Sequence, residues 1–195
     1  MKSEPFVRGL NFGEGLRWHE DRFWYSDFHQ HRVSSAAPDG TTRVELEIDD
    51  RPSGLGWLPD GRLLVVAMLN QRVLRREKDG RAVLHADLKG LAKFHANDML
   101  VDSRGNAFIG CFGFDLDAFI EKNGTAPLFA EPGPPTAPIM RVTPDGKASI
   151  GTMAGGSLDR VAQGRRLESV PSGERSKAVR PGMKHSATIG RHLCR

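Results

Sequence analysis

A repeated strand–turn–strand pattern constrains the fold of this chain more than any other feature of its sequence. In residues 97–112, a short apolar strand, a polar turn and a second apolar, β-prone strand follow one another. The pattern recurs in residues 13–25 and 54–66, so that the three copies start near positions 14, 55 and 98. A repeat of about 40–50 residues made of short strands is typical of β-propeller blades. We therefore predict an all-β fold of the β-propeller type rather than a sandwich.

Tight-turn sequences and apolar runs add detail to this prediction. Pro-Asp-Gly occurs at 38–40, 59–61 and 144–146, and such turns connect antiparallel strands. The continuous apolar run 63–69 predicts a strand buried on both faces. The Gly- and Pro-rich segment 124–138 predicts a long loop, and long loops on a rigid scaffold often bind ligands. Further strands are expected at 6–7, 23–25, 44–48, 72–76, 82–88, 139–142 and 147–150.

Charge and aromatic content divide the chain into two parts. Residues 155–195 contain 9 Lys and Arg against 3 Asp and Glu, whereas every Phe, Trp and Tyr lies at or before Phe129. We expect residues 1–154 to form a partial β-propeller. Residues 155–195 are a basic Arg-, Ser- and Gly-rich tail, predicted to be disordered or to arise from a frameshift. A natural short chain with an unrelated tail is the alternative.

Several classes of protein are disfavoured by the composition. The two cysteines, Cys111 and Cys194, imply no disulfide framework, and Cys111 on an apolar strand is predicted to be a small core residue. The N-terminus shows no signal peptide, and no stretch approaches the ~20 apolar residues of a membrane span. We therefore expect a soluble, cytoplasmic protein with no membrane partner. The basic tail has no aromatic residues for base stacking, which disfavours nucleic acid. The oligomeric state is not predicted.

Asn97 and Asp98 are the first candidate site residues, because two adjacent polar side chains precede an apolar strand. They either point into a site or cap the strand by binding backbone amides. A zinc site at His19, His29 and His31 is the disfavoured alternative to surface histidines, because no further ligand lies near them in sequence. The Gly-x-Ser-x-Gly motif of many serine hydrolases is absent.

Three stretches together give the chain a family resemblance. Residues 13–18 (Gly-Glu-Gly-Leu-Arg-Trp), 53–56 (Ser-Gly-Leu-Gly) and 97–105, with Asn97-Asp98 and Val101-Asp102-x-x-Gly105, resemble the SMP-30/gluconolactonase/LRE family. The tract 109–116 is similar to a bacterial branch of it. The resemblance implies a six-bladed β-propeller with a divalent metal in its central channel that hydrolyses sugar lactones and related cyclic esters. It covers about residues 10–152, half of a full-length member, so we expect about three to four blades here.

The resemblance also assigns roles to individual residues. Glu14 matches the acidic metal ligand of the first blade, and Asn97, with Asp98 beside it, matches a substrate-contacting Asn of the third. His95 stands where some members have an Arg that binds substrate, and His offers fewer donors than a guanidinium. Asp115 lies near the position of an acidic substrate contact.

Other parts of the family's site have no counterpart in the sequence. The remaining two metal ligands, an Asn and an Asp that also serves as the base, come from later blades, and nothing after Thr152 resembles them. The catalytic residue is therefore unknown. We expect a lactonase with one divalent cation, calcium before manganese, magnesium or zinc, that acts weakly or not at all on a small-molecule lactone. The alternative is a non-catalytic ligand-binding or interaction module.

Overall fold

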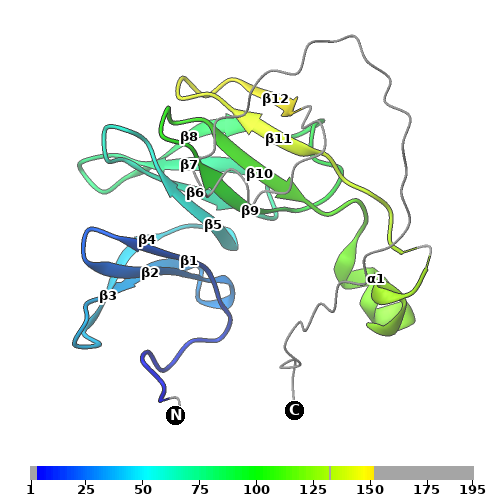
Figure 1. Ribbon diagram of the computed structural model, residues 1–195, viewed down its shortest axis with the longest axis horizontal. Coiled ribbons are helices and arrows are strands. Elements are labelled where there is room, and N and C mark those ends of the chain that lie inside the picture. The colour runs from blue at the N-terminus through cyan, green and yellow to red at the C-terminus, as the bar shows by residue number, and fades with distance from the viewer. Residues whose placement is uncertain (1–3, 132, 152–195) are drawn as a thin grey trace, which may run out of the picture. The chain divides into compact units, whose positions relative to one another are not determined.

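Three four-stranded antiparallel sheets dominate the computed structural model, which describes residues 4–131 and 133–151 (Figure 1). Each sheet is built from strands that follow one another in the chain. The first contains β1 (Gly13–His19), β2 (Arg22–Asp27), β3 (Arg32–Ala36) and β4 (Thr42–Glu47); the second contains β5 (Pro52–Trp57), β6 (Leu63–Ala67), β7 (Arg72–Arg76) and β8 (Ala82–Asp87); the third contains β9 (Ala96–Val101), β10 (Ala107–Cys111), β11 (Ile139–Val142) and β12 (Ala148–Gly151). The predicted repeat of units made of short strands is confirmed, and each unit has four strands.

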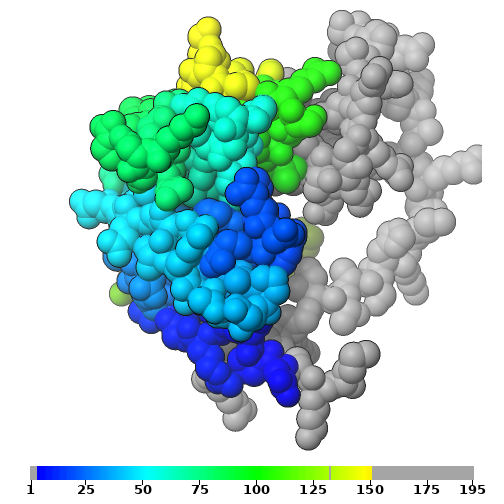
Figure 2. Space-filling view, turned by 90° about the vertical axis from the view of Figure 1, so that its left-hand side faces the viewer, coloured from blue at the N-terminus to red at the C-terminus, as the bar shows by residue number. Residues whose placement is uncertain are grey.

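The second sheet lies between the first and the third, as both Figure 1 and Figure 2 show. Its first strand, β5, packs against β1 and β2 on one side and against β9 on the other. All five residues of β6 are buried, and they alternate between two apolar clusters. Leu63 and Val65 pack toward the first sheet, and Leu64 and Val66 pack toward the third. The prediction of a strand buried on both faces is therefore confirmed.

Residues 139–151 complete the third sheet, since β11 pairs with β10 and β12 pairs with β11. The described residues thus form three sheets, the lower of the predicted numbers. Between β10 and β11 the chain forms the helix α1 (Leu116–Asn123), which was not predicted, and a short 3-10 turn (Ala126–Phe129) within the predicted loop 124–138. A further 3-10 turn (Phe28–Gln30) follows β2.

The N-terminal segment differs from its prediction. Phe6 and Val7 do not form an edge strand; instead, the ring of Phe6 packs edge-to-face on Phe23 of β2, with ring centres 6.1 Å apart. Phe6 is thus held by a side-chain contact rather than by backbone pairing, and it remains 48% exposed. The tail predicted for residues 155–195 lies outside the described residues. No helix in residues 4–131 or 133–151 is long and apolar enough to cross a membrane.

Candidate functional site

Three polar side chains occupy the same position in the three sheets. Glu14, Ser53 and Asn97 are each the second residue of the first strand of their sheet, in β1, β5 and β9 respectively. Because these first strands pack side by side, equal positions along them come close together. Residues separated by 39 and 44 positions in the sequence therefore meet at one end of the strands.

Ser53 joins the other two side chains. Its hydroxyl Oγ lies 2.7 Å from Oε1 of Glu14 and 2.6 Å from Oδ1 of Asn97. Ser53 is completely buried, whereas Glu14 and Asn97 are half-buried. The two predicted site residues are thus brought together by Ser53. The sequence analysis named this serine only as part of the family motif 53–56 and did not predict it as a site residue.

Glycines next to the site allow this close approach. A Cβ atom on Gly15 would lie well under 3.0 Å from the backbone oxygen of Ser53, and one on Gly54 would come equally close to the backbone nitrogen of Met99. Side chains larger than hydrogen would therefore push the first strands apart. The guanidinium group of Arg17 adds a link from β1 to β9 by donating to the backbone carbonyl of Met99.

The electrostatics at Glu14 favour a positive ligand. Burial raises the pKa of the Glu14 carboxyl, the hydrogen bond from Ser53 opposes this, and the negative charge of Asp98 raises the pKa further. A carboxylate whose ionised form is disfavoured by burial and by a neighbouring negative charge is stabilised when a cation binds to it. Asp98 itself is exposed.

The donor atoms of Glu14 and Asn97 fit a hard divalent cation. Carboxylate and amide oxygens are the ligands that Ca²⁺, Mg²⁺ and Mn²⁺ prefer. Within residues 4–131 and 133–151, no three Asp, Glu, His or Cys side chains gather in a cluster that would hold a metal. Glu14 would therefore hold such a cation without two further Asp, Glu, His or Cys ligands from the described residues.

His95 and Asp115 make local hydrogen bonds within the fold that the sequence analysis did not predict. His95 is half-buried just before β9, and its backbone carbonyl accepts a hydrogen bond from the Phe112 amide at 3.0 Å. The carboxylate of Asp115 accepts from the Ala118 amide at 3.0 Å and so caps the N-terminus of α1. Neither side chain is hydrogen-bonded to Glu14, Ser53 or Asn97 within the described part of the chain.

The segment between β10 and β11 starts from the same end of the strands as Asn97. Cys111, the last residue of β10, is paired with Ala96, and its half-buried thiol faces the carbonyl of Pro138 at 3.7 Å. Asp117 of α1 forms an ion pair at 3.5 Å with Arg51, and Arg51 precedes Ser53 by two residues in the sequence. The segment that carries α1 is thus anchored close to the end of β5 where the site lies.

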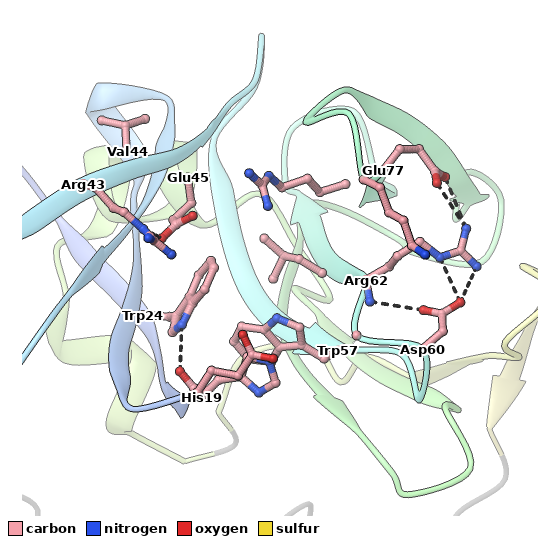
Figure 3. A pocket seen from close by; sticks show the side chains of 14 residues that line it. His19, Trp24, Arg43, Val44, Glu45, Trp57, Asp60, Arg62 and Glu77 are labelled. Carbon is pink, nitrogen blue, oxygen red and sulfur yellow. Dashed lines mark hydrogen bonds and ion pairs between the residues drawn. The ribbon is translucent and has the colours of Figure 1, made fainter.

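A separate hollow lies at the opposite end of β1 and β5 (Figure 3). It has a volume of about 640 Å³ between the first and second sheets. The residues that line it do not include Glu14, His95, Asn97, Asp98 or Asp115. His19 stacks on Trp57 with ring centres 3.9 Å apart, and Arg62 forms ion pairs with Asp60 and Glu77. Most of the charged side chains that line this hollow already form ion pairs with one another. They are therefore less available to a charged ligand than the Glu14 carboxylate.

The three candidate histidines do not form a metal centre. His19 packs against Trp57, and Nδ1 of His31 lies 2.8 Å from the carbonyl of Asp50. His29 is exposed in the 3-10 turn after β2. No metal-binding cluster of His, Cys, Asp or Glu includes them in the described residues.

Solved structures with the same arrangement of sheets define the class of fold. A gluconolactonase from Xanthomonas campestris aligns with a TM-score of 0.56 at 22% sequence identity, over 74% of this chain and 48% of that one. A calcium-binding regucalcin from Agrobacterium tumefaciens gives 0.51 at 18% identity, over 72% and 43%. A chain of a nidogen/laminin complex gives 0.51 at 15% identity, over 71% and 47%. The chain is therefore part of a β-propeller, and it spans about half the length of these structures.

The family follows from the sequence. The pattern that defines the SMP-30/Gluconolactonase/LRE-like region matches residues 12–155, and the chain belongs to this family. The resemblance noted in the motifs at 13–18, 53–56 and 97–105 is thus confirmed. No curated protein sequence matches the chain.

Proposed function

We propose that this chain carries part of a divalent-cation-dependent hydrolase of sugar lactones or related cyclic esters. The observation that supports this best is the meeting of Glu14, Ser53 and Asn97 at the same position of three neighbouring strands. Membership of the SMP-30/Gluconolactonase/LRE-like family and the gluconolactonase fold of a solved neighbour support it independently. Calcium is the cation we favour, because the donors are oxygens and a neighbour of the same fold is a calcium-binding protein.

Each residue of the site has a role in this proposal. Glu14 holds the cation, which when bound polarises a lactone carbonyl and activates water. Asn97 orients the substrate by hydrogen bonding, and exposed Asp98 is available to a sugar hydroxyl beside it. His95 and Asp115 are proposed as further substrate contacts. Glu14, His95, Asn97, Asp98 and Asp115 do not supply the general base in this proposal, so we expect slow turnover from this chain alone.

The proposal also includes the cellular location and the partners of the protein. We expect it to act in the cytoplasm on a small-molecule lactone, since the two cysteines do not indicate an oxidising compartment. Membrane and nucleic-acid partners are not expected.

A non-catalytic interaction module is the second candidate. The fold by itself does not require catalysis, because a chain of a nidogen/laminin complex has it as well. The chain also spans about half of its structural neighbours, so a part of the site that completes catalysis would have to come from elsewhere.

Metal-dependent turnover separates the two candidates. The chain is assayed against a panel of sugar lactones with Ca²⁺, with a chelator, and after Glu14→Gln, which removes the ligand charge while keeping its size. Turnover that the chelator abolishes and that Glu14→Gln lowers at least 100-fold supports the enzyme. Glu20→Gln is the matched control, because Glu20 is exposed at the other end of β1. Ligand binding without turnover, or equal rates in the two variants, would contradict the proposed hydrolase.

A further inference from the structure

The hydroxyl of Ser53 has one hydrogen but lies within hydrogen-bond distance of two oxygen atoms. Its Oγ is 2.7 Å from Oε1 of Glu14 and 2.6 Å from Oδ1 of Asn97. A serine hydroxyl donates one hydrogen bond and accepts up to two. Both short contacts are therefore satisfied only when one of the two neighbours donates a hydrogen to Ser53.

Asn97 is the neighbour that supplies this hydrogen most readily. Its amide group carries two N–H bonds, and a half-turn about its last side-chain bond exchanges nitrogen and oxygen with little change in shape. Glu14 would have to be protonated in order to donate, and it would then lose the charge with which it attracts a cation. With the nitrogen of Asn97 toward Ser53, the hydroxyl donates to Glu14 and the carbonyl oxygen of Asn97 faces away from Ser53.

We propose that Ser53 is a positioning residue of the site, which fixes the Glu14 carboxylate and turns the carbonyl oxygen of Asn97 outward to meet a cation or a substrate hydroxyl. This inference rests on the proposed function, because it assigns Ser53 to the same site. Hydrogen bonds of this kind, from a residue behind the ligands, commonly change metal affinity 10–100-fold.

The surroundings of Ser53 make it a rigid support. The residue is completely buried in β5, the first strand of the central sheet. The hydroxyl of Ser26 donates to its backbone carbonyl at 2.6 Å, and Gly54 lets β5 lie directly against β9. A fixed backbone and a short side chain leave the Ser53 hydroxyl few alternative positions. Among the described residues, it is the one whose side chain is hydrogen-bonded to both Glu14 and Asn97.

Two substitutions at Ser53 and one matched control test the proposal. Ser53→Ala removes the hydroxyl, and Ser53→Cys keeps a side chain of similar shape but replaces the hydroxyl with a much weaker hydrogen-bond group. Ser34→Ala removes another buried hydroxyl, in β3, and within the described residues Ser34 is not hydrogen-bonded to Glu14, Ser53 or Asn97. Affinity for Ca²⁺ is measured by calorimetry on the full chain, and the side-chain amide of Asn97 is followed by nitrogen-15 NMR in the absence of metal. Cooperative unfolding of each variant confirms that it is folded.

The expected result is at least a tenfold loss of Ca²⁺ affinity in both Ser53 variants and less than threefold in Ser34→Ala. The Asn97 amide signal should exchange slowly with water in the wild type and rapidly in both Ser53 variants. Equal Ca²⁺ affinity in wild type and folded Ser53 variants would overturn the proposal. If the wild-type chain binds no Ca²⁺, the cation-dependent function fails, and an Asn97 amide that is unaffected at Ser53→Cys then overturns the positioning role as well.

Discussion

At the scale of single residues, His85 gives the molecule a predictable response to pH. It is buried in β8, and its Nδ1 lies 3.2 Å from Nη1 of Arg75, which donates to the neutral imidazole. Burial lowers the pKa of His85, and the positive charge of Arg75 lowers it further. At mildly acidic pH the folded state therefore binds fewer protons at this histidine than the unfolded state, whose imidazole titrates near pH 6.5.

The free energy of unfolding should consequently fall as the pH drops from about 7 through 6.5 toward the lowered folded-state pKa. His85→Gln removes this contribution, so its stability should change less than that of wild type between pH 7 and pH 5. Urea unfolding at several pH values measures the free energy of unfolding of wild type and His85→Gln. The other histidines are the same in both proteins, so their contributions cancel in the difference between the two curves. Parallel curves for the two proteins would contradict the prediction.

The residues of the candidate site were only partly predictable. Glu14 and Asn97 stand in motifs that a family resemblance identifies, and the structure brings them together. Ser53 was not predicted as a site residue, because serine is common before strands and its role depends on which residues of β1 and β9 lie beside it. Asp115 was predicted as a substrate contact, and the structure adds a helix-capping role that the short sequence of α1 did not reveal.

At the scale of the strands, close backbone contact between neighbouring sheets is the feature that the site depends on. A Cβ atom on Gly54 would collide with the backbone of Met99, whereas one on Gly110, in β10, would meet no atom within 4 Å. Gly54→Ala should therefore destabilise the fold by about 3 kcal/mol. Gly110→Ala should change stability by no more than about 0.5 kcal/mol. Denaturant unfolding compares the two, and similar losses in both variants would show that the approach of β5 to β9 is not critical.

The strands themselves were largely predictable, and the segment between β10 and β11 was not. Alternating and continuous apolar runs bounded by Asp-Gly turns mark strands such as β6 and β11 directly. The helix α1 has only eight residues and none of them is buried. It therefore lacks the buried apolar face from which a helix is usually predicted. Its position is set by the cap at Asp115 and by the ion pair between Asp117 and Arg51, a contact between distant parts of the chain.

At the scale of the whole molecule, the site belongs to no single sheet. Glu14 lies in the first sheet, Ser53 in the second and Asn97 in the third, and two apolar clusters hold these sheets against one another. The repeat in the sequence predicted the sheets, but the sequence alone did not specify that the side chains at the second position of each first strand would meet. The reason is that this meeting depends on how the sheets pack, which no single copy of the repeat encodes.

Because Glu14, the proposed ligand, is linked through Ser53 of the second sheet to Asn97 of the third, a cation bound at Glu14 should stabilise the folded arrangement in which the three sheets meet. A ligand that binds only the folded state stabilises it by about 2.7 kcal/mol at 100 times its dissociation constant. For a domain of this size that corresponds to a rise of roughly 5–10 °C in melting temperature with Ca²⁺. The rise should disappear in Glu14→Gln and persist in Glu20→Gln, as calorimetric melting with and without Ca²⁺ will show. An equal rise in both variants would place the cation away from Glu14, and the meeting of the three strands would then have a structural role alone.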